Sequence, residues 1–154
     1  MSALAPLAGR RLDALLLLAA VGLAVSGYLT WVALDAGAEA FCSGVGDCAT
    51  VQSSRYANVA GAPVALLGLG MYGTLLLLVA VRRRDGALGR SEAARAATFG
   101  LALSVALYSA YLTYVELFVI DAICAWCVAS ALIVMAMLAL CLPDVRASGV
   151  SSRG

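Results

Sequence analysis

Four apolar stretches, each long enough to cross a lipid bilayer as a helix, constrain this chain more than any other feature. They cover about residues 12–34, 63–81, 96–117 and 123–142. A bilayer has a hydrocarbon core about 30 Å thick, which about 20 helical residues can span. Hydrophobic residues make up 64% of the chain, whereas a soluble domain is about half apolar. The sequence therefore predicts an all-α membrane protein, a bundle of four transmembrane helices.

Basic residues gather in three places and predict the orientation of the bundle. Arg10 and Arg11 precede the first stretch, and the tail holds Arg146 and Arg153. The link between the second and third stretches carries the remaining cluster of Arg82, Arg83, Arg84, Arg90 and Arg95. The other two links hold only Arg55. Under the positive-inside rule, both termini and the middle link face the cytoplasm, and residues 35–62 and 118–123 face outward.

The stretches are expected to form one membrane domain, residues 12–142, between a cytoplasmic N-terminal segment, 1–11, and a cytoplasmic tail, 143–154. Pro143 is expected to end the fourth helix, because proline breaks helical hydrogen bonding. The tail is rich in Ser and Gly and is expected to be disordered. A cleavable signal peptide is the alternative for the first stretch, but that stretch is longer than the apolar core of a signal peptide.

The composition excludes several kinds of functional site. The chain has no His, which excludes a Ser-His-Asp triad and most zinc sites. The net charge of +1 and the short Arg clusters beside apolar stretches give no case for a nucleic-acid partner. The stretches also lack the charged or broken-helix features of most transporters. Chemistry must therefore come from cysteines, carboxylates, hydroxyls or a bound cofactor.

Four of the five cysteines form two close pairs. Cys42 and Cys48 enclose a short loop with two glycines, which a disulfide can close without strain. Cys124 and Cys127 form a C-x-x-C where the last outer link enters the fourth helix, and a helix N-terminus stabilises a thiolate. The predicted orientation puts both pairs on the outer, oxidising side of the membrane. The fifth cysteine, Cys141, is expected to be a packing residue.

Several functions fit these cysteines. The Cys42–Cys48 pair alone fits a disulfide that staples an exported loop, as in a structural membrane subunit, and the four together fit a Cys₄ metal site. Two pairs on one side, one in a flexible loop and one at a helix start, favour a disulfide relay. A relay needs an electron acceptor, and the sequence carries no flavin or haem signature. A lipid-soluble quinone is therefore the expected acceptor, with no metal.

The order of the motifs points to a family. Ser54 follows Cys48 by six residues, and the C-x-x-C comes last. Further matching positions are residues 53–57, Gly61, Pro63, Gly68 and Tyr72. In this combination the chain resembles the vitamin K epoxide reductase family, specifically its bacterial quinone-reducing members. The DsbB-type quinone reductases also have four spans, but they carry the C-x-x-C in the first outer loop, so the order favours the first family.

The resemblance implies a four-helix bundle that holds a quinone, menaquinone or ubiquinone, between the outer ends of its helices. The long loop, 35–62, would cap the quinone, with a short helix over about 53–60 along the membrane surface. Cys127 would face the quinone as the active thiolate, Cys124 would take electrons from the loop pair, and Ser54 would orient the loop or bond near the ring. The candidate quinone contacts are Cys127, Ser54, Val64, Trp126, Ala131 and Tyr111.

Three residues qualify this picture. Val64 stands where animal members of the family have an Asn that contacts the naphthoquinone, so simple quinone reduction is favoured over epoxide reduction. Asp121, three residues before Cys124, is a candidate cap for the fourth helix. Glu116 has no expected role.

The predicted function is that of a thiol–quinone oxidoreductase of the bacterial inner membrane, active on the outer face and supporting disulfide formation in exported proteins. A separate thioredoxin-fold, DsbA-like protein is expected to donate electrons, because the chain ends soon after the fourth stretch. Electrons would pass from Cys42 and Cys48 to Cys124 and Cys127 and then to the quinone, with Cys48 meeting the partner. The alternatives are a structural subunit with stapling disulfides and a naphthoquinone or epoxide reductase.

Overall fold

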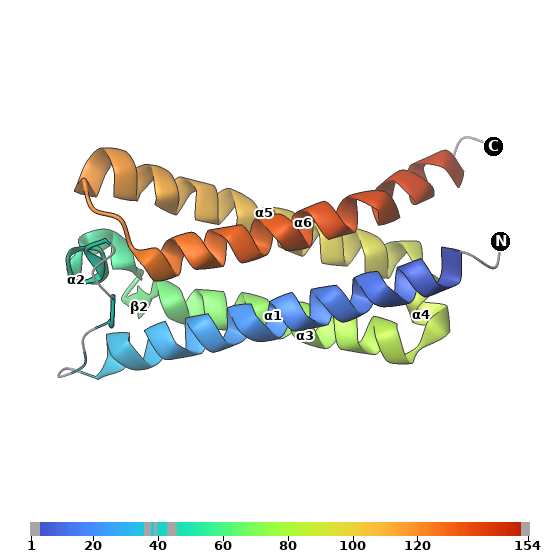
Figure 1. Cartoon of the computed structure of the whole chain (residues 1–154), viewed down its shortest axis with the longest axis horizontal. Coiled ribbons are helices and arrows are strands. Elements are labelled where there is room, and N and C mark those ends of the chain that lie inside the picture. The colour runs from blue at the N-terminus through green and yellow to red at the C-terminus, as the bar shows by residue number, and fades with distance from the viewer. Residues whose placement is uncertain (1–3, 36–37, 39, 43–45, 152–154) are drawn as a thin grey trace.

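Four long helices run side by side in the computed structural model (Figure 1), which describes residues 4–35, 38, 40–42 and 46–151. They are α1 (Leu4–Leu34), α3 (Val64–Arg84), α5 (Glu92–Val115) and α6 (Ala125–Ser151). A π-helical turn, η2 (Glu116–Ile120), extends α5, and α4 (Gly86–Arg90) links α3 to α5. Each long helix contains a segment apolar enough to cross a membrane: Gly9–Leu34, Val64–Arg84, Glu92–Ile120 and Ala125–Asp144. The predicted all-α bundle of four membrane-crossing helices is confirmed.

The helices pack as two pairs. Helix α1 lies along α3 and α5 lies along α6, and contacts between α1 and α6 and between α3 and α5 join the pairs. Tyr72 of α3 is central to this packing and is almost fully buried. Its ring fills the space above Gly22, where any side chain would overlap it. Its hydroxyl lies 2.9 Å from Ser130 Oγ and donates to the Ser130 carbonyl at 3.0 Å, so one residue connects α1, α3 and α6.

The outward faces of the four helices are apolar. Large side chains more than half exposed include Leu17 on α1, Leu77 on α3, Leu107 on α5 and Leu132 on α6. A soluble protein seldom exposes apolar side chains all around its helices. Lipid contact on these faces is the arrangement that a multi-pass membrane protein requires.

The long connection between α1 and α3 folds into short elements at one end of the bundle (Figure 1). These are α2 (Cys48–Ser53), the 3₁₀ turn η1 (Arg55–Ala57) and the antiparallel strands β1 (Asn58–Val59) and β2 (Ala62–Pro63). The sequence predicted a single short helix over about 53–60 instead. The helix lies earlier because Asp47 caps it, accepting hydrogen bonds from the Thr50 N–H at 3.0 Å and the Thr50 hydroxyl at 2.6 Å.

A tight turn replaces the later part of the expected helix. Ala60 and Gly61 both adopt positive φ, at 52° and 86°. Two consecutive left-handed residues form the two-residue turn that suits a β-hairpin, and Asn58 pairs with Pro63 across it. Helix α3 begins at the residue that follows the hairpin.

The fourth helix differs from expectation at its end. Pro143 was predicted to terminate it, but α6 continues through Pro143 to Ser151. Asp144, just beyond the proline, forms an ion pair with Arg82 of α3, with 3.0 Å between the guanidinium nitrogen and the carboxylate oxygen. This tertiary contact holds the chain in helical register past the proline, at the cost of one backbone hydrogen bond. Of the tail predicted to be disordered, residues 152–154 lie outside the described residues.

Candidate functional site

Both cysteine pairs lie at the end of the bundle that carries α2. Cys42 and Cys48 form a disulfide with Cα atoms 6.2 Å apart. Cys124 and Cys127 are free thiols, the first fully buried and the second partly exposed. Cys48 and Cys124 belong to one apolar cluster, against which Cys42 and Cys127 also pack. The structure therefore brings together two pairs that are far apart in the sequence.

The loop that carries the disulfide is bound to the segment just before α6. The Asp47 N–H donates to the Ile123 carbonyl at 2.9 Å, and Gly46 forms an isolated bridge with Cys124. Gly46 has a φ of 85°, and a Cβ at this position would overlap the Ile123 carbonyl oxygen. Only glycine fits so close an approach. This contact holds the loop disulfide against the C-x-x-C.

A second contact holds the other side of the loop. Trp126, inside the C-x-x-C, donates its indole N–H to the Phe41 carbonyl at 2.8 Å. The Phe41 N–H donates to the Tyr28 hydroxyl at 2.9 Å, and the rings of Tyr28 and Trp126 lie 5.1 Å apart. Phe41 directly precedes Cys42, so the chain entering the disulfide is fixed between α1 and α6.

Cys124 occupies the N-terminus of α6, and its carbonyl accepts the Val128 N–H at 3.0 Å. The pKa of the Cys124 thiol is lowered to about 7, chiefly because the Cys127 side chain hydrogen-bonds to it. The backbone N–H groups of Cys127 and Trp126 add to the lowering, while burial and the Glu116 charge oppose it. The resemblance implied a thiolate on Cys127, and this role stays a prediction, since the hydrogen bond between the two thiols lets them share one negative charge.

Glu116 is the residue of this site for which the sequence predicted no role. It begins the π-helical turn η2, and its side chain is buried. One carboxylate oxygen, Oε2, accepts the Cys124 N–H at 3.0 Å, so Glu116 rather than Asp121 caps the start of α6. Asp121 instead adopts a left-handed conformation and donates its N–H to the Glu116 carbonyl. The signal in the sequence was an acidic residue inside an apolar span, which is costly unless it has a function.

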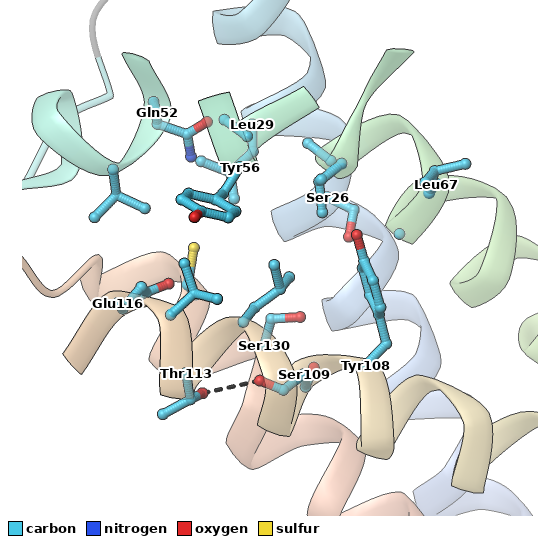
Figure 2. A pocket seen from close by; sticks show the side chains of 18 of the residues that line it. Ser26, Leu29, Gln52, Tyr56, Leu67, Tyr108, Ser109, Thr113, Glu116 and Ser130 are labelled. Carbon is cyan, nitrogen blue, oxygen red and sulfur yellow. Dashed lines mark hydrogen bonds between the residues drawn. The ribbon is translucent and has the colours of Figure 1, made fainter. Parts of the chain in front are cut away.

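A cavity of about 110 Å³ opens beside Cys127. Its wall includes residues of every long helix and of the short elements between α1 and α3, and most of them are apolar. Its polar groups include Tyr56, Tyr108, Glu116 and Ser130. Figure 2 shows the Tyr56 ring entering from the loop side, across from Glu116 and Ser130. Apolar walls with a few placed polar groups are typical of small-molecule sites.

The predicted quinone contacts divide into two groups. Cys127, Ser54 and Val64 line the cavity. The Ser54 hydroxyl is already engaged, since it donates to the Val51 carbonyl at 2.7 Å and closes the end of α2. The other three do not belong to the wall that the described residues form: Trp126, Ala131 and Tyr111. Tyr111 is 51% exposed, and Tyr108, one turn earlier, takes the place expected for it.

Comparison with known proteins identifies a family and a curated relative. Residues 14–142 match the model of the vitamin K epoxide reductase family. A curated relative, the thiol-disulfide oxidoreductase LTO1 of Arabidopsis thaliana, is 35% identical over 124 residues, which make up 77% of this chain and 32% of the relative. The chain therefore spans about a third of the length of that relative.

Proposed function

The chain belongs to the vitamin K epoxide reductase family, and we propose that it is a multi-pass membrane oxidoreductase that transfers electrons from a protein dithiol to a membrane quinone. The observation that carries the proposal is the docking of the Cys42–Cys48 disulfide on a C-x-x-C whose Cys127 opens into a cavity. A disulfide, a dithiol and a small-molecule cavity in contact make up a complete path for two electrons.

The path starts with a partner protein. Its dithiol reduces the Cys42–Cys48 disulfide and becomes a disulfide itself. A loop thiolate then attacks the Cys124–Cys127 disulfide through a mixed disulfide, which restores the loop disulfide and leaves the C-x-x-C as two thiols. These thiols give two electrons and two protons to the quinone and become a disulfide again.

Burial assigns roles to the two loop cysteines. Cys48 is 2% exposed and shares an apolar cluster with Cys124, whereas Cys42 is partly exposed. An incoming thiolate needs access to the sulfur that it attacks. We therefore assign contact with the partner to Cys42 and the inner exchange to Cys48 and Cys124, the reverse of the order expected from the sequence.

The cavity suits a quinone ring. Its walls are mainly apolar, and Cys127 and a few polar groups lie at its edge. These features match a flat apolar ring with two carbonyl oxygens. Val64 lies in the wall, where its apolar side chain offers no hydrogen bond to a ring oxygen. We therefore favour simple reduction of menaquinone or ubiquinone over reduction of an epoxide.

The partner and the location complete the proposal. A separate thioredoxin-fold, DsbA-like protein would supply the dithiol, and its own oxidation would support disulfide formation in exported proteins. The positive-inside rule puts the end with α2 on the outer face of a bacterial inner membrane, with both termini of a single membrane domain in the cytoplasm. The contact between the loop and the C-x-x-C supports this arrangement, since both pairs must meet the same compartment.

The test is quinone reduction by the purified protein, driven by a reduced thioredoxin-fold donor. Cys127→Ala is expected to lower the rate to the uncatalysed background, because Cys127 is the one cysteine in the cavity wall that the described residues form. Cys141→Ala, which removes a buried thiol of α6 far from the site, is the matched control and should retain activity. A structural subunit with stapling disulfides would instead show no donor-dependent quinone reduction in the wild type.

A further inference from the structure

The buried carboxylate of Glu116 lies between the C-x-x-C and the cavity. Its side chain is 4% exposed, and it belongs both to the cavity wall and to the surroundings of the two thiols. An ionisable residue inside a membrane span is costly and usually serves a function. Glu116 therefore requires an explanation beyond packing.

Two observations define the position of this carboxylate. Oε2 accepts the backbone N–H of Cys124 at 3.0 Å. Glu116 also lines the same cavity as the Cys127 thiol. The same group thus bonds the backbone of one cysteine and shares a cavity wall with the other. Since Cys127 lines the cavity, the carboxylate is next to the sulfur that meets a bound quinone.

Opposite charge does not explain the burial. Among the residues that the structure describes, the ion pairs join Arg82 to Asp144 and Arg83 to Asp13, and Glu116 has no Arg partner. Other titratable groups that face the site are the Cys124 and Cys127 thiols from α6, Tyr56 from η1 and Tyr108 from α5. Helix α2, which packs on η2, contributes Cys48, held in a disulfide. The titratable neighbours of Glu116 in the described part of the chain are therefore groups that can release protons.

The backbone conformation around Glu116 directs its side chain toward the cysteines. The π-helical turn η2 inserts an extra residue at the end of α5, and π-turns occur mostly at functional sites. The N–H groups of Asp121 and Ala122 both donate to the Glu116 carbonyl. These bonds fix the backbone of Glu116 so that its side chain turns back toward Cys124.

We propose that Glu116 is the proton carrier of the quinone-reducing step, an inference that rests on the proposed function. Two thiols and one quinone become one disulfide and one hydroquinone, so two protons must leave sulfur and reach quinone oxygens. The Glu116 carboxylate takes the proton that Cys127 releases as its sulfur gives up electrons. The resulting carboxylic acid then protonates the quinone oxygen nearest to it and returns to a carboxylate. The second proton comes from Cys124 or from solvent.

The decisive variant is Glu116→Gln, which retains an oxygen to accept the Cys124 N–H but cannot carry a proton. Glu92→Gln, an exposed substitution at the other end of the same helix, is the matched control. The fully reduced protein is mixed with a short-tailed ubiquinone analogue, and quinone absorbance is followed through a single turnover. Glu116→Gln is expected to slow this step about 100-fold, a usual loss when general acid–base catalysis is removed. Glu116→Asp is expected to recover part of the rate, and Glu92→Gln all of it.

A second readout is independent of quinone. The Glu116 charge opposes formation of the Cys124 thiolate, so Glu116→Gln should move the thiolate titration of Cys124 to lower pH. Exchange between the loop disulfide and the C-x-x-C, followed by trapping the mixed disulfide, should remain within about threefold of wild type, a spread well below the loss expected for the quinone step. A carboxylate that only positions Cys124 predicts wild-type quinone kinetics in Glu116→Gln, and that result would overturn the proposal.

Two outcomes separate this proposal from the proposed function. If the wild type exchanges disulfides but never reduces the quinone, the proposed function fails. If the wild type reduces the quinone and Glu116→Gln does so equally fast, only the role of Glu116 fails. Should Glu116→Gln not fold, infrared difference spectra of the wild type decide the question. A carboxylic acid band must rise and decay during quinone reduction, and its absence would also overturn the proposal.

Discussion

Among the residues that the structure describes, each end of the bundle buries one charged side chain, and the two are held in different ways. At the end opposite the cysteines, the guanidinium of Arg82 donates to Thr98 at 2.9 Å and to Asp144 at 3.0 Å. At the cysteine end, the Glu116 carboxylate accepts the Cys124 N–H and shares a cavity wall with the Cys127 thiol. A charge paired with an opposite charge is fixed in its ionised form, whereas a carboxylate beside thiols can exchange a proton. We infer that the buried charge of Arg82 stabilises the fold, whereas the buried charge of Glu116 takes part in the chemistry of the site.

Removal of the Arg82 charge should give the largest change in stability. Arg82→Met leaves Asp144 without its ion-pair partner, and breaking a buried pair costs about 3–5 kcal/mol. Asp144 is 24% exposed, so water offsets part of this cost and we expect a loss of about 2–3 kcal/mol. Denaturation in detergent micelles measures it, and quinone reduction per folded molecule should not change.

Arg83→Met is the matched control for this prediction. Arg83 pairs with Asp13 at 2.7 Å, but both side chains are about half exposed, and such surface pairs contribute little. We expect no measurable change in unfolding. Equal losses in the two variants would contradict the structural role assigned to the Arg82 end.

The acidity of Cys124 should distinguish the cysteine end from an ordinary thiol. Its pKa is lowered from 9.0 to about 7, chiefly by the Cys127 hydrogen bond. A lowered pKa means that the thiolate is present above about pH 7 and is lost as the pH falls through that value. Ultraviolet absorbance of the thiolate should therefore rise with a midpoint near pH 7 in the dithiol form. Cys124→Ser should remove this transition, and a midpoint near 9 would contradict the site geometry.

Two glycines test whether the loop must lie against the C-x-x-C. Gly46 and Gly61 have almost the same φ, 85° and 86°, so Ala costs similar backbone strain at both, about 1–2 kcal/mol. A Cβ would strike the Ile123 carbonyl only at Gly46, while at Gly61 it meets nothing within 4 Å. Gly46→Ala should slow exchange between loop and C-x-x-C about tenfold to a hundredfold, because displacement by about 1 Å is enough for such a loss. Equal rates in the two variants would show that loop docking does not limit exchange.

The sequence predicted features that depend on local patterns. Apolar length determines the four spans, and the cysteine spacing identifies both pairs. Pro143 shows the limit of a local rule, because an ion pair from another helix holds α6 together beyond it. Glu116 shows a second limit, since its direction depends on a π-helical turn that no spacing in the sequence indicates.

The tyrosines of α5 show why cavity residues were predicted only in part. Tyr108, Tyr111 and Tyr114 recur every three residues, and the sequence predicted a quinone contact at Tyr111. A helix turns by about 100° per residue, so each step of three rotates the next side chain about 60° away from the previous one. Tyr108 lines the cavity, whereas Tyr111 and Tyr114 are more than half exposed. Which member of such a stripe faces inward depends on how the helix packs.

The smallest expected effect concerns the second contact of the loop. Trp126→Phe retains an aromatic ring beside Tyr28 but removes the indole N–H that donates to the Phe41 carbonyl at 2.8 Å. One hydrogen bond contributes about 1 kcal/mol, so exchange between loop and C-x-x-C should slow about threefold to tenfold, without the larger loss expected for Gly46→Ala. Trp31→Phe, at an exposed position of α1, is the control. A loss in Trp126→Phe as large as in Gly46→Ala would mean that Phe41, rather than the Gly46 contact, determines where the disulfide lies.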